Sequence, residues 1–147
     1  MYERILLPTD GSEGTEHAVD HAIALAKQFG AALDVLHVTD APVLPLDAHS
    51  QALLDAIEEE GRSAVEEIVE RASRRGVGTV AGVVREGEPY RTILDYVDEE
   101  DVDLVVMGTH GRTGLDRYLL GSVTERVARL SDVPVVIVPR PEEAAED

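Results

Sequence analysis

The sequence predicts an α/β protein: a single domain built on an open five-stranded parallel sheet, of strand order 3-2-1-4-5, with helices on both faces. Its 147 residues suffice for one domain around one core. Short aliphatic, β-branched runs alternate with longer stretches of helical period along the chain. Strands separated by helices are joined by right-handed crossovers, so this alternation implies a parallel sheet with helices on both faces.

The first half of the chain is expected to hold two strands and two helices, separated by turn-forming residues. In order, the predicted elements are a strand at 4–7, a turn at 8–12, a helix from Ser12 to Gly30, a strand at 32–38, a loop at 39–50 and a helix at 51–75. Gly30 and Gly76 follow the two helices, in the position where glycine commonly ends a helix. His37 is expected to alternate with core residues in its strand.

The second half repeats the pattern. The predicted elements are a strand at 79–84, a helix from Pro89, a strand at 102–107, a glycine-rich loop, a helix from Gly121 and a strand at 134–138. The continuous apolar run at 104–107 is typical of a central strand that is covered on both sides. Residues 140–147 are charged and lack periodicity, so we expect a domain at 1–139 followed by an acidic, disordered tail.

Composition excludes several classes of function. With 13 basic and 30 acidic side chains the formal net charge is −17, which disfavours nucleic acids and anionic membranes as partners. Cysteine is absent, which excludes disulfides and thiolate chemistry. Lys27 is the only lysine. Such an acidic, lysine-poor chain fits either a halophile-like acidic surface in a high-salt cytoplasm or simply an acidic protein from a GC-rich genome.

The N-terminus enters a strand pattern at once, without the architecture of a signal peptide, and no apolar run approaches the length of a membrane span. We therefore expect a soluble, cytoplasmic protein.

Polar and glycine-rich residues follow two strands that should be neighbours. The cluster 8–12 follows the first strand, and the cluster 108–114 follows the fourth. In an order of 3-2-1-4-5 these two strands flank the point where strand order reverses, and open parallel sheets bind ligands beyond the carboxyl ends of strands at that point. The pattern predicts a binding site there.

The loop after the fourth strand has the features of a phosphate site. Gly108 and Gly111 are followed, after nine residues, by Gly121 and Ser122. Glycines let backbone N–H groups approach a phosphate, and a helix N-terminus attracts anions. The hydroxyls of Ser122 and Thr124 are further donors.

Local charge agrees with this interpretation, because four arginines and two acids lie between Gly108 and Arg129: Arg112, Arg117, Arg126 and Arg129 against Asp116 and Glu125. The alternative is that the glycines only turn a corner and that the arginines pair with acids on neighbouring elements.

Other phosphate-binding classes fit poorly. The chain has neither a P-loop signature nor a G-x-G-x-x-G run after its first strand. A receiver domain would need an acid after the third strand and a lysine after the fifth. The chain has Arg85-Glu86 and Pro139-Arg140 at those places.

These residues resemble the universal stress protein family, in its ATP-binding subgroup. The spacing Gly108-x-x-Gly111, nine residues, Gly121-Ser122 matches the family's ATP-binding pattern, and 5–12 and 133–138 resemble its first strand and turn and its closing strand. The resemblance covers the chain except its tail and implies the family's adenine nucleotide alpha hydrolase-like fold. It also implies ATP and Mg²⁺ as cofactors.

The resemblance assigns a set of positions to the nucleotide. They are Pro8, Thr9, Asp10, Val38, Met107, Gly108, Thr109, His110, Gly111, Arg112, Gly121, Ser122, Val123 and Thr124. It implies that Asp10 reaches the ribose hydroxyls or a Mg²⁺-bound water, and that the backbone of Val38 faces the adenine edge. Met107 and Gly108 would lie under the ribose and the α-phosphate.

The resemblance also implies that Gly111, Gly121, Ser122 and Val123 bind the phosphates, mostly through backbone N–H groups. The family pattern fixes neither His110 nor Arg112. Mg²⁺ would be held mainly by phosphate oxygens.

Three functions remain open. We prefer a nucleotide-dependent switch or binding module of the stress response, because no residue is clearly a catalytic base and the phosphate-binding lysine is absent. A slow Mg-dependent ATPase is the main alternative, and a nucleotide-independent dimeric adaptor is another. No catalytic residue is therefore assigned.

Three further features have competing interpretations. The family pairs its closing strands about a two-fold axis, so the expected homodimer interface is Val135, Val136, Ile137 and Val138, against the alternative of a merely protected edge. His17 and His21 have the spacing of a metal pair but lack a nearby third ligand. The acidic run at 98–101, with Asp103, is expected to be a solvated helix end rather than a cation site.

Overall fold

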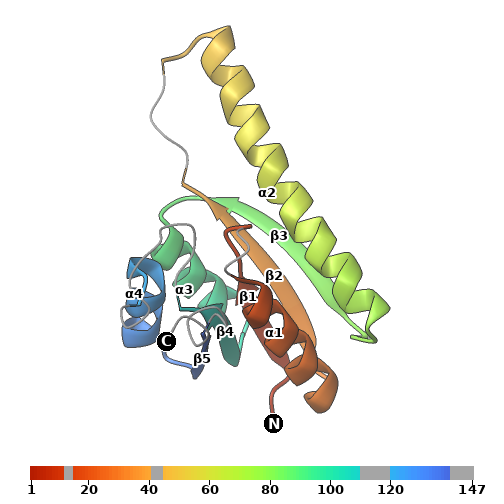
Figure 1. Cartoon of the computed structure of the whole chain (residues 1–147). Helices are drawn as coiled ribbons and strands as arrows, with labels where there is room; N and C mark the ends of the chain where they lie inside the picture. Colours follow the sequence, from red (N-terminus) through yellow and green to blue (C-terminus); the bar gives the residue numbers. More distant parts are fainter. Residues whose placement is uncertain (12–14, 41–44, 110–119, 140–147) are drawn as a thin grey trace, which may run out of the picture.

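The computed structural model describes residues 1–11, 15–40, 45–109 and 120–139. In this part of the chain strands and helices alternate strictly (Figure 1). The elements are β1 (Arg4–Pro8), α1 (Glu16–Phe29), β2 (Ala32–Thr39), α2 (Ala48–Arg74), β3 (Val80–Glu86), α3 (Pro89–Glu99), β4 (Leu104–Gly108), α4 (Ser122–Leu130) and β5 (Val135–Val138). The predicted sequence of elements is confirmed.

The five strands form one parallel sheet in the order β3-β2-β1-β4-β5, as predicted. The chain builds outward from β1 through β2 to β3, and then returns to the other side of β1 with β4. Leu6 in β1 consequently lies opposite Asp34 of β2 and Val105 of β4. The order reverses between β1 and β4, so their carboxyl ends mark the switch point of the sheet.

Helices cover both faces, and each face has its own apolar core. Alternate residues of β1 divide between the two: Ile5 and Leu7 pack in the core under α1 and α2, whereas Leu6 packs in the core under α3 and α4. The contact between α2 and β3 is close. A Cβ atom placed on Gly82 would lie 2.5 Å from Cγ1 of Val65, so the absence of a side chain at this position lets the helix approach the strand.

Two helices begin three or four residues away from their predicted starts. The start of α2 is Ala48 rather than residue 51, because the Asp47 side chain accepts a hydrogen bond of 2.7 Å from the backbone N–H of Ser50 and so caps an additional turn. The start of α1 is Glu16 rather than Ser12, with Thr15 as its N-cap residue. The connection between the end of β1 at Pro8 and the start of α1 at Glu16 is therefore longer than the polar cluster 8–12. Figure 1 shows the N-terminal half of α2 extending beyond the sheet.

One charged group lies inside the core under α3. Asp34 is only 2% exposed, and its Oδ2 atom lies 3.0 Å from Nη1 of Arg4 and accepts a 2.7 Å hydrogen bond from the Tyr96 hydroxyl. Burial, reinforced by this hydrogen bond, raises the pKa of Tyr96 far above its ordinary value. The sequence pattern had placed Asp34 in a strand without indicating a partner for it.

No helix in the described ranges combines the length and apolarity that a bilayer span requires. The predicted tail, 140–147, lies outside the described residues.

Candidate functional site

A pocket of about 280 Å³ opens at the carboxyl ends of β1 and β4, at the switch point of the sheet. Its lining comes from both halves of the chain. The lining residues are Pro8, Thr9, Asp10, Thr15, Leu36, Val38, Ile93, Met107, Gly108, Gly121, Ser122, Val123 and Thr124. Parallel strands bring their carboxyl ends to one edge, which explains how positions more than a hundred residues apart come to face one cavity.

Most of the positions expected to contact a nucleotide are brought together in this pocket. Those on the wall are Pro8, Thr9, Asp10, Val38, Met107, Gly108, Gly121, Ser122, Val123 and Thr124. Thr109 is not among the lining residues, but its carbonyl accepts a 2.8 Å hydrogen bond from the Gly121 N–H and so joins the end of β4 to the start of α4. His110, Gly111 and Arg112 lie outside the described residues.

The N-terminus of α4 forms one wall of the pocket. Gly121 is the N-cap residue, and the helix begins at Ser122. The first N–H groups of a helix have no acceptor within it and carry the positive end of the helix dipole, so this wall favours an anion. The Thr124 hydroxyl donates a 2.9 Å hydrogen bond to the carbonyl of Gly108 and ties α4 to β4. Its proton is therefore already engaged, whereas Ser122 is exposed on the pocket wall.

Another wall of the pocket is the turn after β1. The Thr9 N–H donates to the carbonyl of Leu36 at 2.9 Å and continues the ladder to β2 past the end of β1. The hydroxyl of Thr9 then accepts a 3.1 Å hydrogen bond from the Gly11 N–H. Gly11 has a φ of 79°, which glycine adopts at little cost. This turn places Asp10 on the pocket wall.

Among the described lining residues, three were missed as site residues. Leu36 and Ile93 are buried apolar residues of β2 and α3, and sequence periodicity assigns such residues only to the core. Thr15 is 7% exposed, with its hydroxyl 3.5 Å from that of Thr9. The predicted helix start at Ser12 would place Thr15 inside α1, whereas it is the N-cap residue just before the helix, without a side-chain capping hydrogen bond.

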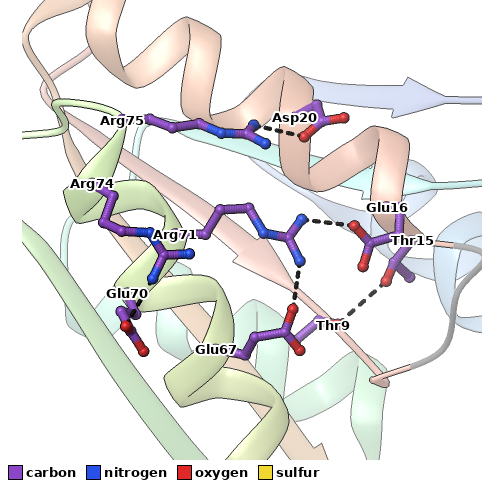
Figure 2. Close-up of polar contacts among 9 residues, drawn as sticks. All are labelled: Thr9, Thr15, Glu16, Asp20, Glu67, Glu70, Arg71, Arg74 and Arg75. Atoms are coloured by element: carbon purple, nitrogen blue, oxygen red, sulfur yellow. Dashed lines mark hydrogen bonds and ion pairs between the residues drawn. The ribbon is translucent and has the colours of Figure 1, made fainter.

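Ion pairs between α1 and α2 support the wall that Thr15 belongs to (Figure 2). Arg71 of α2 lies 2.6 Å from a carboxylate oxygen of Glu16, in the first turn of α1, and 2.7 Å from one of Glu67. One turn further on, Arg75 pairs with Asp20 at 2.8 Å. The hydrogen bond that Arg71 donates to Glu16 is the main cause that raises the pKa of Arg71. The start of α1 is thus held by charges as well as by apolar packing.

The arginines of the predicted basic region differ in their partners. Arg129 pairs with Glu125 within α4 at 2.8 Å, as the alternative interpretation expected. Arg126 instead lies over the ring of Tyr90, with its guanidinium carbon 5.1 Å from the ring centroid. Arg112 and Arg117 lie outside the described residues.

The two other candidate sites are the histidine pair on α1 and the acidic run near the end of α3. In the part of the chain that the structure describes, neither is joined by further metal ligands. Within these ranges no three side chains of the metal-binding types gather. His17 and His21 are both exposed on α1. The carboxylate of Asp103 accepts hydrogen bonds from the backbone N–H groups of Glu3 (2.9 Å) and Arg4 (3.3 Å) and so anchors the start of β1.

Comparison with known proteins identifies relatives over almost the whole chain. Residues 1–139 match the universal stress protein family. Universal stress protein MJ0531 of Methanocaldococcus jannaschii is 37% identical over 144 residues, which cover 96% of this chain and 84% of that protein.

Solved structures of universal stress proteins have the same fold as this chain. The universal stress protein UspA from Lactobacillus plantarum is 28% identical and superposes with a TM-score of 0.85, over 93% of this chain and 97% of its own. A universal stress protein solved in complex with cAMP is 29% identical, with a TM-score of 0.69 and coverage of 94% and 97%. With the family match, the close relative and the shared α/β architecture all in agreement, this chain belongs to the universal stress protein family.

Proposed function

We propose that the protein binds ATP in the pocket between β1 and β4 and acts as a nucleotide-dependent switch or binding module in a stress response. The observation that carries the proposal is the pocket itself. It unites the turn after β1 with the N-terminus of α4 at the switch point of a parallel sheet. The related structure in complex with cAMP supports an adenine nucleotide as the class of ligand.

In this proposal the two walls bind different parts of the nucleotide. The backbone of Val38, at the carboxyl end of β2, faces the adenine, over an apolar floor that includes Leu36 and Ile93. Phosphates bind at the N-terminus of α4, where Gly121 admits them close to the backbone and Ser122 adds a hydroxyl. Met107 and Gly108 lie beneath the ribose and the α-phosphate.

Mg²⁺ fits this arrangement as a partner of the phosphates. Among the described lining residues Asp10 is the only carboxylate, which is too few ligands for an all-protein site but suits a cation bound mainly by phosphate oxygens and water. Asp10 would hold the ribose hydroxyls or one of those waters. The cation would neutralise phosphate charge there, which matters in a chain with a net charge of −17.

The first prediction is that the purified protein binds Mg-ATP at one site per chain and hydrolyses it negligibly. Binding is measured by denaturing the purified protein and identifying the released nucleotide, and by titrating nucleotide-free protein. Turnover is measured as phosphate release, all at a salt concentration where the protein is folded.

Multiple turnovers that disappear in Asp10→Ala would instead favour a slow ATPase. If the protein retained no nucleotide and had no measurable affinity for ATP, the proposal would be contradicted and a nucleotide-independent adaptor would be favoured.

We further propose that the protein is a homodimer that pairs through β5. This strand lies at the edge of the sheet, and three of its four residues are only half-buried. The Val105 N–H donates to the carbonyl of Pro134 at 3.0 Å. In a parallel ladder only every second residue bonds to a given neighbour, so Val136 continues the ladder to β4 while the N–H of Ile137 points away from it. An aliphatic edge of this kind is a template for a second strand.

The second prediction is that Ile137→Pro converts a dimer into a monomer, because it removes an outward donor without removing a hydrogen bond to β4. Sedimentation should give twice the mass of one chain for the wild type and for Ile137→Val, which keeps the N–H group, and one chain mass for Ile137→Pro. A monomeric wild type would contradict the dimer. A dimeric Ile137→Pro would place the interface on another surface.

A further inference from the structure

His37 is a buried polar side chain that the proposed binding function does not yet use. It lies in β2, is 9% exposed, and points to the face covered by α1 and α2 rather than into the pocket. Its Nδ1 atom lies 3.0 Å from the carbonyl oxygen of Thr9. A carbonyl oxygen can only accept, so Nδ1 carries the proton and donates it.

The imidazole ring has a fixed place because α2 leaves room for it at Gly61. A Cβ atom at this position would lie 2.4 Å from Cδ2 and 2.8 Å from Nε2 of His37, well inside contact distance. Glycine in the middle of a helix lowers helix stability relative to alanine. Because Gly61 has no side chain, the histidine ring has room to lie between α2 and β2.

The hydrogen bond from His37 completes the attachment of Thr9 to β2. The N–H of Thr9 donates to Leu36 O at 2.9 Å, and its carbonyl accepts from His37, so both backbone groups of Thr9 are bound to consecutive residues of β2. The Thr9 hydroxyl in turn accepts from the Gly11 N–H. The orientation of Thr9 therefore sets the turn on which Asp10 lies.

We infer that His37 is a positioning residue of the nucleotide pocket: it holds the Thr9 carbonyl, fixes the turn from Thr9 to Gly11, and thereby places Asp10 on the pocket wall. This inference rests on the proposed nucleotide binding for its effect on affinity. The contact between His37 and Gly61 makes α2 part of the same support. Loss of the Nδ1 donor leaves the Thr9 carbonyl without this hydrogen bond and lets the turn relax.

The test compares His37→Leu, which removes the donor, with His37→Asn, whose side-chain amide nitrogen can occupy the place of Nδ1. ATP affinity is measured by titration, and the exchange rate of the Gly11 amide hydrogen is measured by NMR without nucleotide. We expect His37→Leu to weaken ATP binding about tenfold and to accelerate Gly11 exchange, whereas His37→Asn stays within about threefold of the wild type. A residue that served only packing would not be rescued by asparagine.

Three further variants extend the test, and the two glycine variants among them keep His37, so a folding defect of His37→Leu does not affect them. Gly61→Ala keeps His37, but its new Cβ atom displaces the imidazole ring, so it should weaken ATP binding. Gly78→Ala should not weaken binding, because its new Cβ atom would have nothing but its chain neighbours within 4 Å. In an Asp10→Ala background, His37→Leu should change the affinity by less than about threefold, because the side chain that it positions is gone.

Three results would each overturn the inference. One is wild-type ATP affinity in His37→Leu, and another is an equal loss of affinity in His37→Leu and His37→Asn. The third is a double variant whose loss of affinity is the product of the losses of His37→Leu and Asp10→Ala. If the wild type bound no ATP, the binding proposal would fail by itself. Gly11 exchange in the same variants would then still decide whether His37 holds the turn.

Discussion

Gly121→Val is expected to raise the dissociation constant for ATP by at least about 100-fold while the protein stays folded. Gly121 is the buried N-cap residue of α4 and lies on the pocket wall, so a valine side chain would occupy the space that the proposal gives to the phosphates. Its backbone angles, φ −61° and ψ 154°, are extended and open to any residue. The substitution therefore introduces no backbone strain, and the poorer cap costs about 1 kcal/mol.

Isothermal titration with Mg-ATP, together with circular dichroism to verify the fold, checks this prediction. Gly78→Val is the matched control, because it adds the same side chain at an exposed glycine, where the new Cβ atom would have nothing but its chain neighbours within 4 Å. Gly121→Ala should lie between the two variants. If Gly121→Val bound ATP as well as Gly78→Val did, the nucleotide phosphates would not lie at the start of α4.

The second large effect is expected on stability, from Arg4→Met. This substitution removes the cation from beside Asp34, whose carboxylate is 2% exposed and would keep only the Tyr96 hydroxyl among the partners described above. Breaking a buried pair usually costs about 3–5 kcal/mol. The Arg4 side chain is 38% exposed, so water can partly replace it, and we expect a loss of about 2 kcal/mol.

Denaturant unfolding of three variants separates the buried pair from general charge effects. Arg74→Met also removes a guanidinium group, but from an exposed pair with Glu70, and should leave the free energy of unfolding nearly unchanged. The triple variant Arg4→Met/Asp34→Leu/Tyr96→Phe replaces the whole polar group by apolar side chains and should recover most of the lost stability. Equal losses for Arg4→Met and Arg74→Met would show that Asp34 does not depend on its partner.

The sheet could be predicted because its elements are separated and their patterns are local. Continuous aliphatic runs such as 104–107 identify strands that are covered on both sides, and right-handed crossovers leave few possible topologies. The position of the pocket then follows from topology, since polar clusters after β1 and β4 must meet wherever these strands are neighbours. Most predicted lining positions needed the family resemblance as well, because spacing alone does not choose among side chains of a turn.

What could not be predicted depends on contacts across the fold. Asp34 has the strand position of a core residue, and only the structure shows Arg4 and Tyr96 reaching it from two other elements. The hydrogen bond of His37 to Thr9 joins residues 28 positions apart, and the ring fits only because Gly61 of α2 lies above it. Such complementarity has no periodicity in the sequence, so pattern analysis does not detect it.

The division of the pocket between the two ends of the chain has a consequence for folding. A chain synthesised only as far as β3 contains the wall from Pro8 to Asp10 but not the one from Gly121 to Thr124. A ligand that needs both walls binds only after β4 has paired with β1 and α4 has docked, and its binding free energy is then added to the completed fold alone. Nucleotide retention would thus distinguish fully assembled chains from partly folded ones during and after synthesis.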